Sequence, residues 1–365
     1  MRVAHSSTLL PLRQAKPDTY ITNDDSQINN ADAVKLSILD QSPIIKGRSP
    51  STAIEETVKL ARLADELGFH RYWLAEHHNM RGLASSCPEV LLTAIGQQTK
   101  QIRIGTGAVL LPYYSAAKVA ETFRMQEALC PGRVDLGIGR APGGDMLTAK
   151  AINEQALYSI NEFPQQVVDL VGWLRDDLGD EHPFNSVKAM PKGDTCPQIW
   201  LLGSSDYSGS LAAHLGVRFA FAHFINPIGG DIVSRQYRAT FTPSALEDRP
   251  TSMVCIFVVC AESSEEAEHL AASIDHRRVM MATGRESEIL PSEEAMNWPY
   301  SEREKQIIRQ ERNRIVLGTP ESVKNQLSII KSDFEADELM VLTITGDYRT
   351  RIKSYELIAQ EFAIN

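Results

Sequence analysis

Short apolar runs alternate with segments of helical periodicity along almost the whole chain. Eight runs have the composition of buried β-strands: Lys35–Leu39, Arg71–Ala75, Ile102–Leu110, Val134–Ile138, Ile199–Leu202, Phe219–Ala222, Met253–Cys260 and Leu339–Ile344. The segments between them are helical in pattern; Thr52–Leu67 spaces its apolar residues near helical intervals, and Gly68 follows as a stop signal. Strands that alternate with helices pair in parallel, so the sequence predicts an α/β fold that closes into a (β/α)8 TIM barrel.

A barrel of this kind usually needs about 250 residues, whereas the chain has 365. We expect the barrel domain over residues 35–365, with additional length in the loops 223–250 and 263–315. The second loop is rich in Glu, Arg and Lys and is expected to form a mobile lid. Two doubly wound domains are the alternative, but no GxGxxG motif follows the first strand, so the usual dinucleotide signal is missing.

Residues 1–34 differ in composition from the rest of the chain. The apolar core of a secretory signal has about 7–15 residues; Ser7–Leu12 is shorter and contains Pro11. We expect a flexible N-terminal extension, with a transit peptide as the alternative.

Composition excludes several classes of partner. The net charge of −10 argues against a broad nucleic-acid surface. No apolar run approaches the roughly 20 residues that span a bilayer. The 5 cysteines form no CxxC pair, which fits a reducing compartment, so we expect a cytoplasmic protein without a membrane segment.

Polar side chains follow several of the strands, at the end where barrels place their chemistry. The strand Arg71–Ala75 is followed by Glu76, His77, His78 and Asn79. Imidazole transfers protons near neutral pH, so the two histidines are candidate catalytic residues. Glu76 and Asn79 are candidates for the substrate pocket. The other candidates for the pocket follow three further strands: Asp40, Tyr113 and His223.

Other roles remain open for the histidines. Adjacent residues of an extended segment point to opposite sides, and no HExxH motif accompanies the pair, so we expect no metal at His77 and His78. A structural role for the pair is the alternative. His223 fits a core position as well as a pocket position.

A second group of residues fits an anion. Gly203, Ser204 and Ser205 end one strand and open a helix, where free N–H groups and hydroxyls can hold a phosphate. Arg140, beside a Gly/Pro-rich loop, suits a bidentate phosphate contact. The alternatives are an ordinary turn with an N-cap for the serines and an ion pair with Asp145 for Arg140.

Six blocks occur in a characteristic order along the chain. They are Trp73–His78, Ile104–Pro112, Pro131–Gly143, Leu201–Ser205, Gly318–Val323 and Asp337–Val341. Together they resemble the bacterial luciferase-like flavin monooxygenase family, over residues 35–363. The Arg-Ala-Pro-Gly form at 140–143 resembles the single-subunit branch more than the light-emitting subunits.

The resemblance implies a (β/α)8 barrel that binds reduced FMN without a covalent bond. Reduced flavin would react with O₂ at its C4a carbon, and the C4a-peroxyflavin would oxidise a small aldehyde- or ketone-like substrate. His77 matches the catalytic histidine of the family, and His78 matches its neighbour.

The cofactor contacts are also carried by the resemblance. Arg140, Ser205 and Ser208 match the contacts to the flavin phosphate, and Gly107–Ala108 matches a non-proline cis peptide beneath the flavin ring. Small residues at 107 and 108 have a second explanation, which is tight packing of neighbouring strands. Gly139 stands where luciferase has a reactive cysteine, so thiol reactivity is not implied here.

The expected activity is therefore that of a flavin-dependent monooxygenase with FMN as cofactor. The expected partners are a small-molecule substrate, O₂, a separate NAD(P)H:flavin reductase and a second copy of the chain in a homodimer. Two alternatives remain: an F420- or FMN-dependent dehydrogenase on the same scaffold, and a flavin-binding protein without turnover.

Overall fold

The computed structural model describes residues 34–140 and 144–364 together with Leu12. The expectations for residues 1–34 and for Ala141–Gly143 therefore lie outside the described residues, except at Leu12 and Val34. Both of these side chains pack at the edge of the main apolar core.

The core of the molecule is a closed barrel of parallel strands, as the sequence predicts. The barrel strands are β1 (Lys35–Asp40), β2 (Arg71–Leu74), β3 (Arg103–Thr106) with its continuation β4 (Val109–Leu110), β5 (Val134–Gly139), β6 (Gln198–Gly203), β7 (Arg218–Ala222), β8 (Ser252–Cys260) and β10 (Glu338–Leu342). Neighbours in this order pair in parallel, and β10 closes the ring because it pairs with both β8 and β1. The alternative of two doubly wound domains is wrong.

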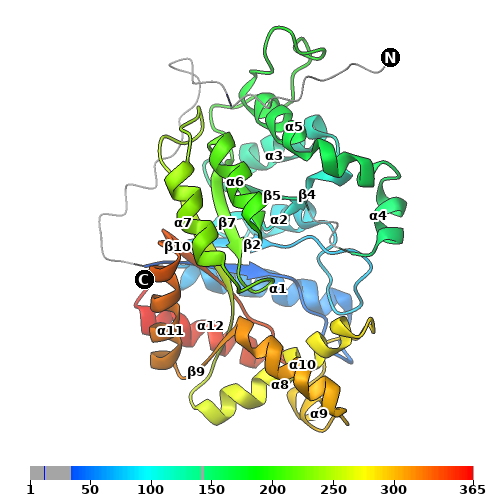
Figure 1. Ribbon diagram of the computed structural model, residues 1–365, viewed down its shortest axis with the longest axis vertical. Helices are drawn as coiled ribbons and strands as arrows, with labels where there is room; N and C mark the ends of the chain where they lie inside the picture. The colour runs from blue at the N-terminus through cyan, green and yellow to red at the C-terminus, as the bar shows by residue number, and fades with distance from the viewer. Residues whose placement is uncertain (1–11, 13–33, 141–143, 365) are drawn as a thin grey trace.

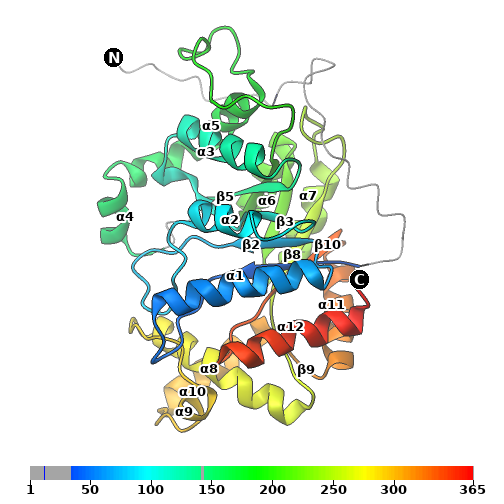
Figure 2. The same cartoon turned by 180° about the vertical axis from the view of Figure 1, so that it is seen from behind.

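Helices surround the barrel, as Figures 1 and 2 show from opposite sides. They are α1 (Pro50–Glu66), α2 (Pro88–Gly96), α3 (Ala116–Leu129), α4 (Met146–Ile152), α5 (Ala156–Arg175), α6 (Asp206–Leu215), α7 (Gly230–Thr240), α8 (Ser264–Ala282), α9 (Ser292–Met296), α10 (Glu302–Glu311), α11 (Pro320–Asp333) and α12 (Tyr348–Phe362), with short 3₁₀ turns η2 (Leu111–Tyr113) and η3 (Arg312–Arg314). In Figure 2, α1 and α12 lie side by side across the barrel, and α8, α9 and α10 gather at one end of the molecule.

The long region after β8 is more structured than the sequence predicts. It contains three helices, and the strand β9 (Ile315–Gly318) pairs with the second half of β8, through Val316 opposite Val258. Most side chains of α8 are buried, which fixes this helix to the barrel. The other expected insertion, 223–250, contains α7, which is the regular helix between β7 and β8.

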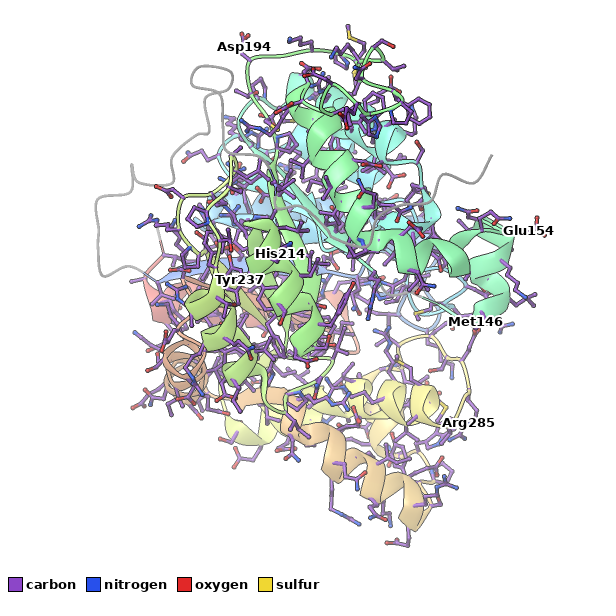
Figure 3. The ribbon with its side chains drawn as sticks, turned by 45° about the horizontal axis from the view of Figure 1, so that its top comes forward. Met146, Glu154, Asp194, His214, Tyr237 and Arg285 are labelled. Atoms are coloured by element: carbon purple, nitrogen blue, oxygen red, sulfur yellow. The ribbon has the colours of Figure 1, made fainter. Side chains whose placement is uncertain are left out.

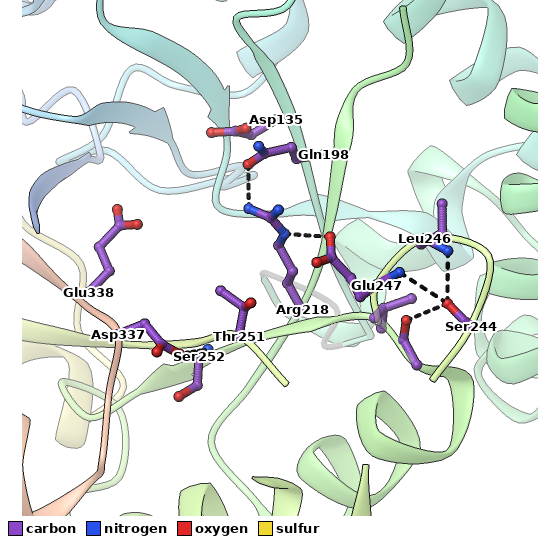
Figure 4. A network of polar contacts seen from close by, with 12 residues as sticks. Asp135, Gln198, Arg218, Ser244, Leu246, Glu247, Thr251, Ser252, Asp337 and Glu338 are labelled. Carbon is purple, nitrogen blue, oxygen red and sulfur yellow. Dashed lines mark hydrogen bonds and ion pairs between the residues drawn. The ribbon is translucent and has the colours of Figure 1, made fainter. Parts of the chain in front are cut away.

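A layer of ion pairs closes the amino-terminal end of the barrel. Arg71 bonds to both Glu338 and Asp135, and Arg103 bonds to the other oxygen of Asp135. Figure 4 shows the outer part of this layer, where Arg218 bonds to Glu247 and Gln198. Each buried charge of this layer is paired with an opposite charge, so the layer packs this end of the barrel. The large cavities lie at the opposite end.

Candidate active site

Two adjoining cavities open at the carboxyl ends of the strands, with volumes of about 460 Å³ and 550 Å³. Both are lined by His77, Met80, Arg277 and Met281, so they form one site with two chambers. The 550 Å³ chamber also reaches Gly144 and Asp145, just before α4, and the loop that carries Arg285. Figure 3 shows the start of α4, at Met146, on the same side of the molecule as Arg285. A concave site of this size at this end of a barrel is the expected location of chemistry.

The alternation of strand β2 directs His77 into this site. Trp73 and Ala75 belong to the apolar cluster inside the barrel, whereas Tyr72 and Leu74 pack outward against the helices. Side chains alternate along an extended chain, so His77 continues the inward series. Its Nδ1 atom is buried, and none of the described residues forms a hydrogen bond with it. Burial, followed by the nearby Arg277 and His78, lowers the pKa of His77 to about 3, so the ring is neutral at physiological pH.

Glu76 lies behind the second histidine and organises it. The Oε1 atom of Glu76 bonds to His78 Nε2 at 2.7 Å and accepts the Tyr114 hydroxyl at 2.6 Å. Its Oε2 atom accepts the backbone N–H of Leu110 at 2.9 Å. The carboxylate is buried and fully engaged, so it orients the site and joins β2 to the segment after β3.

Tyr113 and Asn79 complete the surroundings of His78. The Tyr113 ring packs edge-on against the His78 ring with 5.8 Å between their centroids. Asn79 has a left-handed φ of 53°, a conformation that Asn adopts more readily than most residues. Its amide donates to Asp145 at 3.1 Å, and its side chain lines the 550 Å³ chamber.

The peptide bond between Gly107 and Ala108 is cis, as the resemblance implies. This bond separates β3 from β4 at the carboxyl end of the barrel. Across from it, Gly139 pairs with Leu110, and a Cβ at Gly139 would lie 3.2 Å from the Cβ of Ala108. Three small residues therefore meet here. A Cβ at Gly107 would also lie 2.7 Å from Leu39 Cδ1 and 3.1 Å from Trp73 Cε3, so tight packing inside the barrel accounts for glycine at this position.

The residues predicted to contact phosphate gather around the first turn of α6. The guanidinium of Arg140, at the end of β5, lies 4.2 Å from the ring centroid of Tyr207. Ser205 is the N-cap of α6, yet its hydroxyl makes no capping bond and lies 3.5 Å from the Ser208 hydroxyl. A Cβ at Gly203 would lie 2.1 Å from Ser208 Oγ, so only glycine leaves room for that hydroxyl.

Two other features of this turn bear on the alternatives. Ser204 contributes through its backbone, because its carbonyl oxygen accepts a hydrogen bond from the Asn226 side-chain amide at 3.2 Å. Asp145 caps α4 through Leu147 and Thr148, and none of the described contacts pairs it with Arg140. The ion pair considered for Arg140 is therefore absent among the described residues.

Asp40 and His223 lie outside the cavities, in contrast to the expectation. Asp40 shares the outward face of β1 with Ile38, and its carboxylate bonds to Arg351 at 2.6 Å and Thr57 at 3.0 Å. These contacts, against the effect of burial, hold its pKa below the usual range. The His223 ring packs edge-on against the Phe334 ring, with 6.1 Å between their centroids. The next residue, Phe224, lines the 460 Å³ chamber.

Arg277 is the prominent residue that sequence reasoning missed. It lies on α8, lines both chambers and is only 8% exposed. Its guanidinium donates to Gln41 Oε1 at 3.2 Å. The segment 263–315 looked like a charged lid, and nothing in its sequence distinguishes Arg277 from the other charged residues of α8.

Comparison with known proteins settles the family. Residues 34–332 match the family model described as luciferase-like monooxygenase. The chain belongs to the luciferase-like monooxygenase family. It is therefore an oxidoreductase, and its relatives include named monooxygenases.

Among its relatives, YwcH of Bacillus subtilis (strain 168), described as uncharacterized, is 45% identical over 90% of this chain and 99% of its own length. The luciferase-like monooxygenase of Escherichia coli (strain K12) is 38% identical over 89% of this chain and 96% of its own. The N-acetyl-S-alkylcysteine monooxygenase of Bacillus subtilis (strain 168) is 35% identical over 89% of this chain and 97% of its own length.

Solved structures share the fold of this luciferase-like chain. Apo-MsnO8 superposes with a TM-score of 0.84 at 34% identity, covering 91% of this chain and 98% of its own. The oxygenating constituent of 3,6-diketocamphane monooxygenase in complex with FMN, at 19% identity, covers 91% and 98% with a TM-score of 0.66. An F420-dependent secondary alcohol dehydrogenase, at 12% identity, covers 90% and 99% with a TM-score of 0.66. These two distant likenesses bear on the fold alone.

None of the described helices is long and apolar enough to cross a membrane. Within residues 34–140 and 144–364, no cluster of three or more His, Cys, Asp or Glu side chains is arranged to hold a metal ion.

Proposed function

We propose that this luciferase-like protein uses reduced FMN and O₂ to insert one oxygen atom into a small organic substrate. The second oxygen atom leaves as water, and the two electrons come from reduced FMN, which is released as FMN. Reduced flavin, when bound, supplies the activation of O₂ at its C4a carbon. The chain supplies binding, orientation, exclusion of water and proton handling.

The observation that carries this proposal is the cluster at the first turn of α6. Arg140 reaches this turn through its contact with Tyr207, and Ser205 and Ser208 present two hydroxyls there. A guanidinium, hydroxyls and the N–H groups of a helix start are the donors that a phosphate dianion requires. The Asp206 carboxylate accepts the Tyr207 N–H at 2.8 Å, so that N–H is already used.

We propose that the flavin ring lies against a shallow backbone surface around Gly107, Ala108 and Gly139. Small residues allow a planar ring to approach the backbone closely. The surface lies at the ends of β4 and β5, and Arg140 follows β5 directly. Ring and phosphate would then occupy neighbouring strand ends of one barrel face.

His77 is proposed to hold or transfer a proton at its free Nδ1 atom. None of the described residues bonds to this buried atom, and the lowered pKa keeps the ring neutral, so an uncharged Nδ1 is available to a reacting group. His78, which Glu76 holds in place, is proposed to form the fixed wall of the site next to His77.

Oxygen chemistry on a reduced flavin requires that water be kept out. The loop at 283–288, between the buried helix α8 and α9, lines the 550 Å³ chamber through Gly284, Arg285, Glu286 and Ser287. We propose this loop as the moving part of the lid and α8 as its fixed support. A separate NAD(P)H:flavin reductase is proposed to supply the reduced FMN.

The test is turnover under ¹⁸O₂. Purified protein, FMN, NADH and an independent flavin reductase would be given a panel of aldehydes, ketones and thioethers. The proposal expects one ¹⁸O atom in the product and none without O₂. Hydride transfer from F420 or reduced FMN to a carbonyl compound under anaerobic conditions would favour the dehydrogenase instead.

A further inference from the structure

The largest unexplained feature of the site is a buried positive charge. Arg277 is 8% exposed, and among the residues that the structure describes no carboxylate lies within ion-pair distance of its guanidinium. Its one protein partner is the neutral amide oxygen of Gln41. Buried charges are costly and are almost always compensated by an opposite charge.

The neighbouring charges do not compensate Arg277. In the 460 Å³ chamber, Glu311 pairs with Arg314 at 3.3 Å, and Arg278 is bound by the Glu311 carbonyl. In the 550 Å³ chamber, Arg285 pairs with Glu304 and Arg81 with Glu286. The Asp145 carboxylate is occupied by Asn79 and the start of α4.

The wall around Arg277 is otherwise apolar on one side. Phe224, Phe257, Ile274, Met281 and Leu342 line the 460 Å³ chamber. His77, with its unpartnered Nδ1, lies at the junction of both chambers. A ligand that fits this arrangement has an apolar body and one anionic end.

We propose that Arg277 binds a carboxylate of the substrate, whose apolar remainder occupies the chamber lined by Phe257 and Leu342. A guanidinium matches a carboxylate in a planar, bidentate fork. The substrate is thus an amphiphilic carboxylic acid that is oxidised at a position away from its carboxylate. This assignment rests on the proposed monooxygenase function for the oxidation step, whereas the anion site stands on the cavity alone.

Charge in the site has a second consequence. Arg277 is one of the groups that lower the pKa of His77. A bound carboxylate would offset that charge and raise the pKa of His77 toward its ordinary value. The proton handling of His77 would then respond to the presence of substrate.

The test compares octanoate with octanamide, which has the same apolar chain and no charge. Calorimetric titration of the FMN-loaded protein is expected to show tighter binding of octanoate. Arg277→Met should weaken octanoate about tenfold to a hundredfold and leave octanamide unchanged, because one charge-assisted contact is removed. Arg277→Lys, which keeps the charge without the fork, should fall between.

Arg285→Met is the matched control, because Arg285 lines the same site but is already paired with Glu304. The proposal is overturned if wild type binds octanoate no more tightly than octanamide, including no detectable binding at millimolar concentration. It is also overturned if Arg277→Met affects octanoate no more than Arg285→Met does. Loss of FMN affinity in Arg277→Met, with octanoate binding kept, would assign Arg277 to the flavin and overturn the proposal.

Titrations of the FMN-free chain separate this inference from the proposed function. A preference for octanoate in a chain that fails to bind FMN would keep the anion site and overturn the flavin chemistry. FMN binding by a chain that does not prefer octanoate would keep the flavin chemistry and overturn the anion site. Melting temperatures show whether each variant is folded, and that of Arg277→Met is expected to equal or exceed the wild-type value because an uncompensated buried charge is removed.

Discussion

The Glu76 carboxylate holds His78 through a hydrogen bond of 2.7 Å between Oε1 and Nε2. The same carboxylate binds the Tyr114 hydroxyl and the Leu110 N–H, so one buried acid connects the histidine strand to the segment after Gly107–Ala108. Sequence alone favoured Glu76 as a pocket residue. Its contacts give it the role of a support behind the pocket.

The first prediction concerns this support. Glu76→Ala leaves His78, Tyr114 and the buried Leu110 N–H without their shared acceptor and should lower the free energy of unfolding by roughly 2–4 kcal/mol. Glu76→Gln keeps the size and one acceptor and should cost less. Urea unfolding measures both, with Glu121→Gln on the exposed face of α3 as the control. A Glu76→Ala protein as stable as this control would contradict the supporting role.

The second prediction concerns His77. Without its imidazole, no side chain at this position can exchange a proton with a reacting group, so His77→Ala should lose about 10²–10⁴ in turnover while FMN affinity stays unchanged. Electrons from reduced FMN would then appear mainly as hydrogen peroxide. Product yield and peroxide are measured together, and a wild-type product yield would leave His77 with a structural role only.

The third prediction follows from the low pKa of His77. The unfolded chain binds a proton near the ordinary histidine pKa of about 6.5, whereas the folded chain binds it only at about 3. Between these values the unfolded state carries more protons, so stability rises with pH across that window and is lost as pH falls. Carboxylates with lowered pKa, such as Asp40, act in the same direction at lower pH.

Unfolding free energies between about pH 5 and pH 6.5 test this point. The slope for wild type should exceed that of His77→Asn by up to about 1.4 kcal/mol per pH unit, the value for one proton. Equal slopes for wild type and His77→Asn would show that the ring titrates normally.

The fourth prediction concerns the surface at Ala108. Its side chain faces Gly139, and a phenyl group there would fill the shallow surface proposed for the flavin ring. Ala108→Phe should therefore abolish FMN binding before it unfolds the barrel. Ala120 lies on the buried face of α3, so Ala120→Phe is the packing control and should lower Tm through overpacking. Retained FMN affinity with a sharp drop in Tm for Ala108→Phe would place the flavin elsewhere.

Strand alternation explains which parts of the site could be read from the sequence. Trp73, Ala75 and His77 have the same parity on one strand, so a cavity position for His77 was predictable. The same rule applied to Ile38 and Asp40, or to Phe221 and His223, turns both polar residues outward. Their misassignment came from considering only their place at a strand end.

Arg277 could not be placed in this way. It lies on α8, in a segment whose length and charge suggested a mobile lid, and its contact with Gln41 joins residues 236 positions apart. No local pattern encodes such a contact, because it depends on how α8 packs across the barrel mouth. The eight barrel strands, by contrast, follow from local composition and were located, whereas the short strand β9 was not.

The central claim is that Arg140, Ser205 and Ser208 hold the phosphate of FMN, and affinity for FMN against riboflavin tests it most directly. Charge-assisted contacts of this kind contribute roughly 1.5–3 kcal/mol each. In fluorescence titrations, wild type should bind FMN at least about tenfold more tightly than riboflavin, and Arg140→Ala should remove most of that difference. Equal affinity of the wild type for the two flavins would contradict the account.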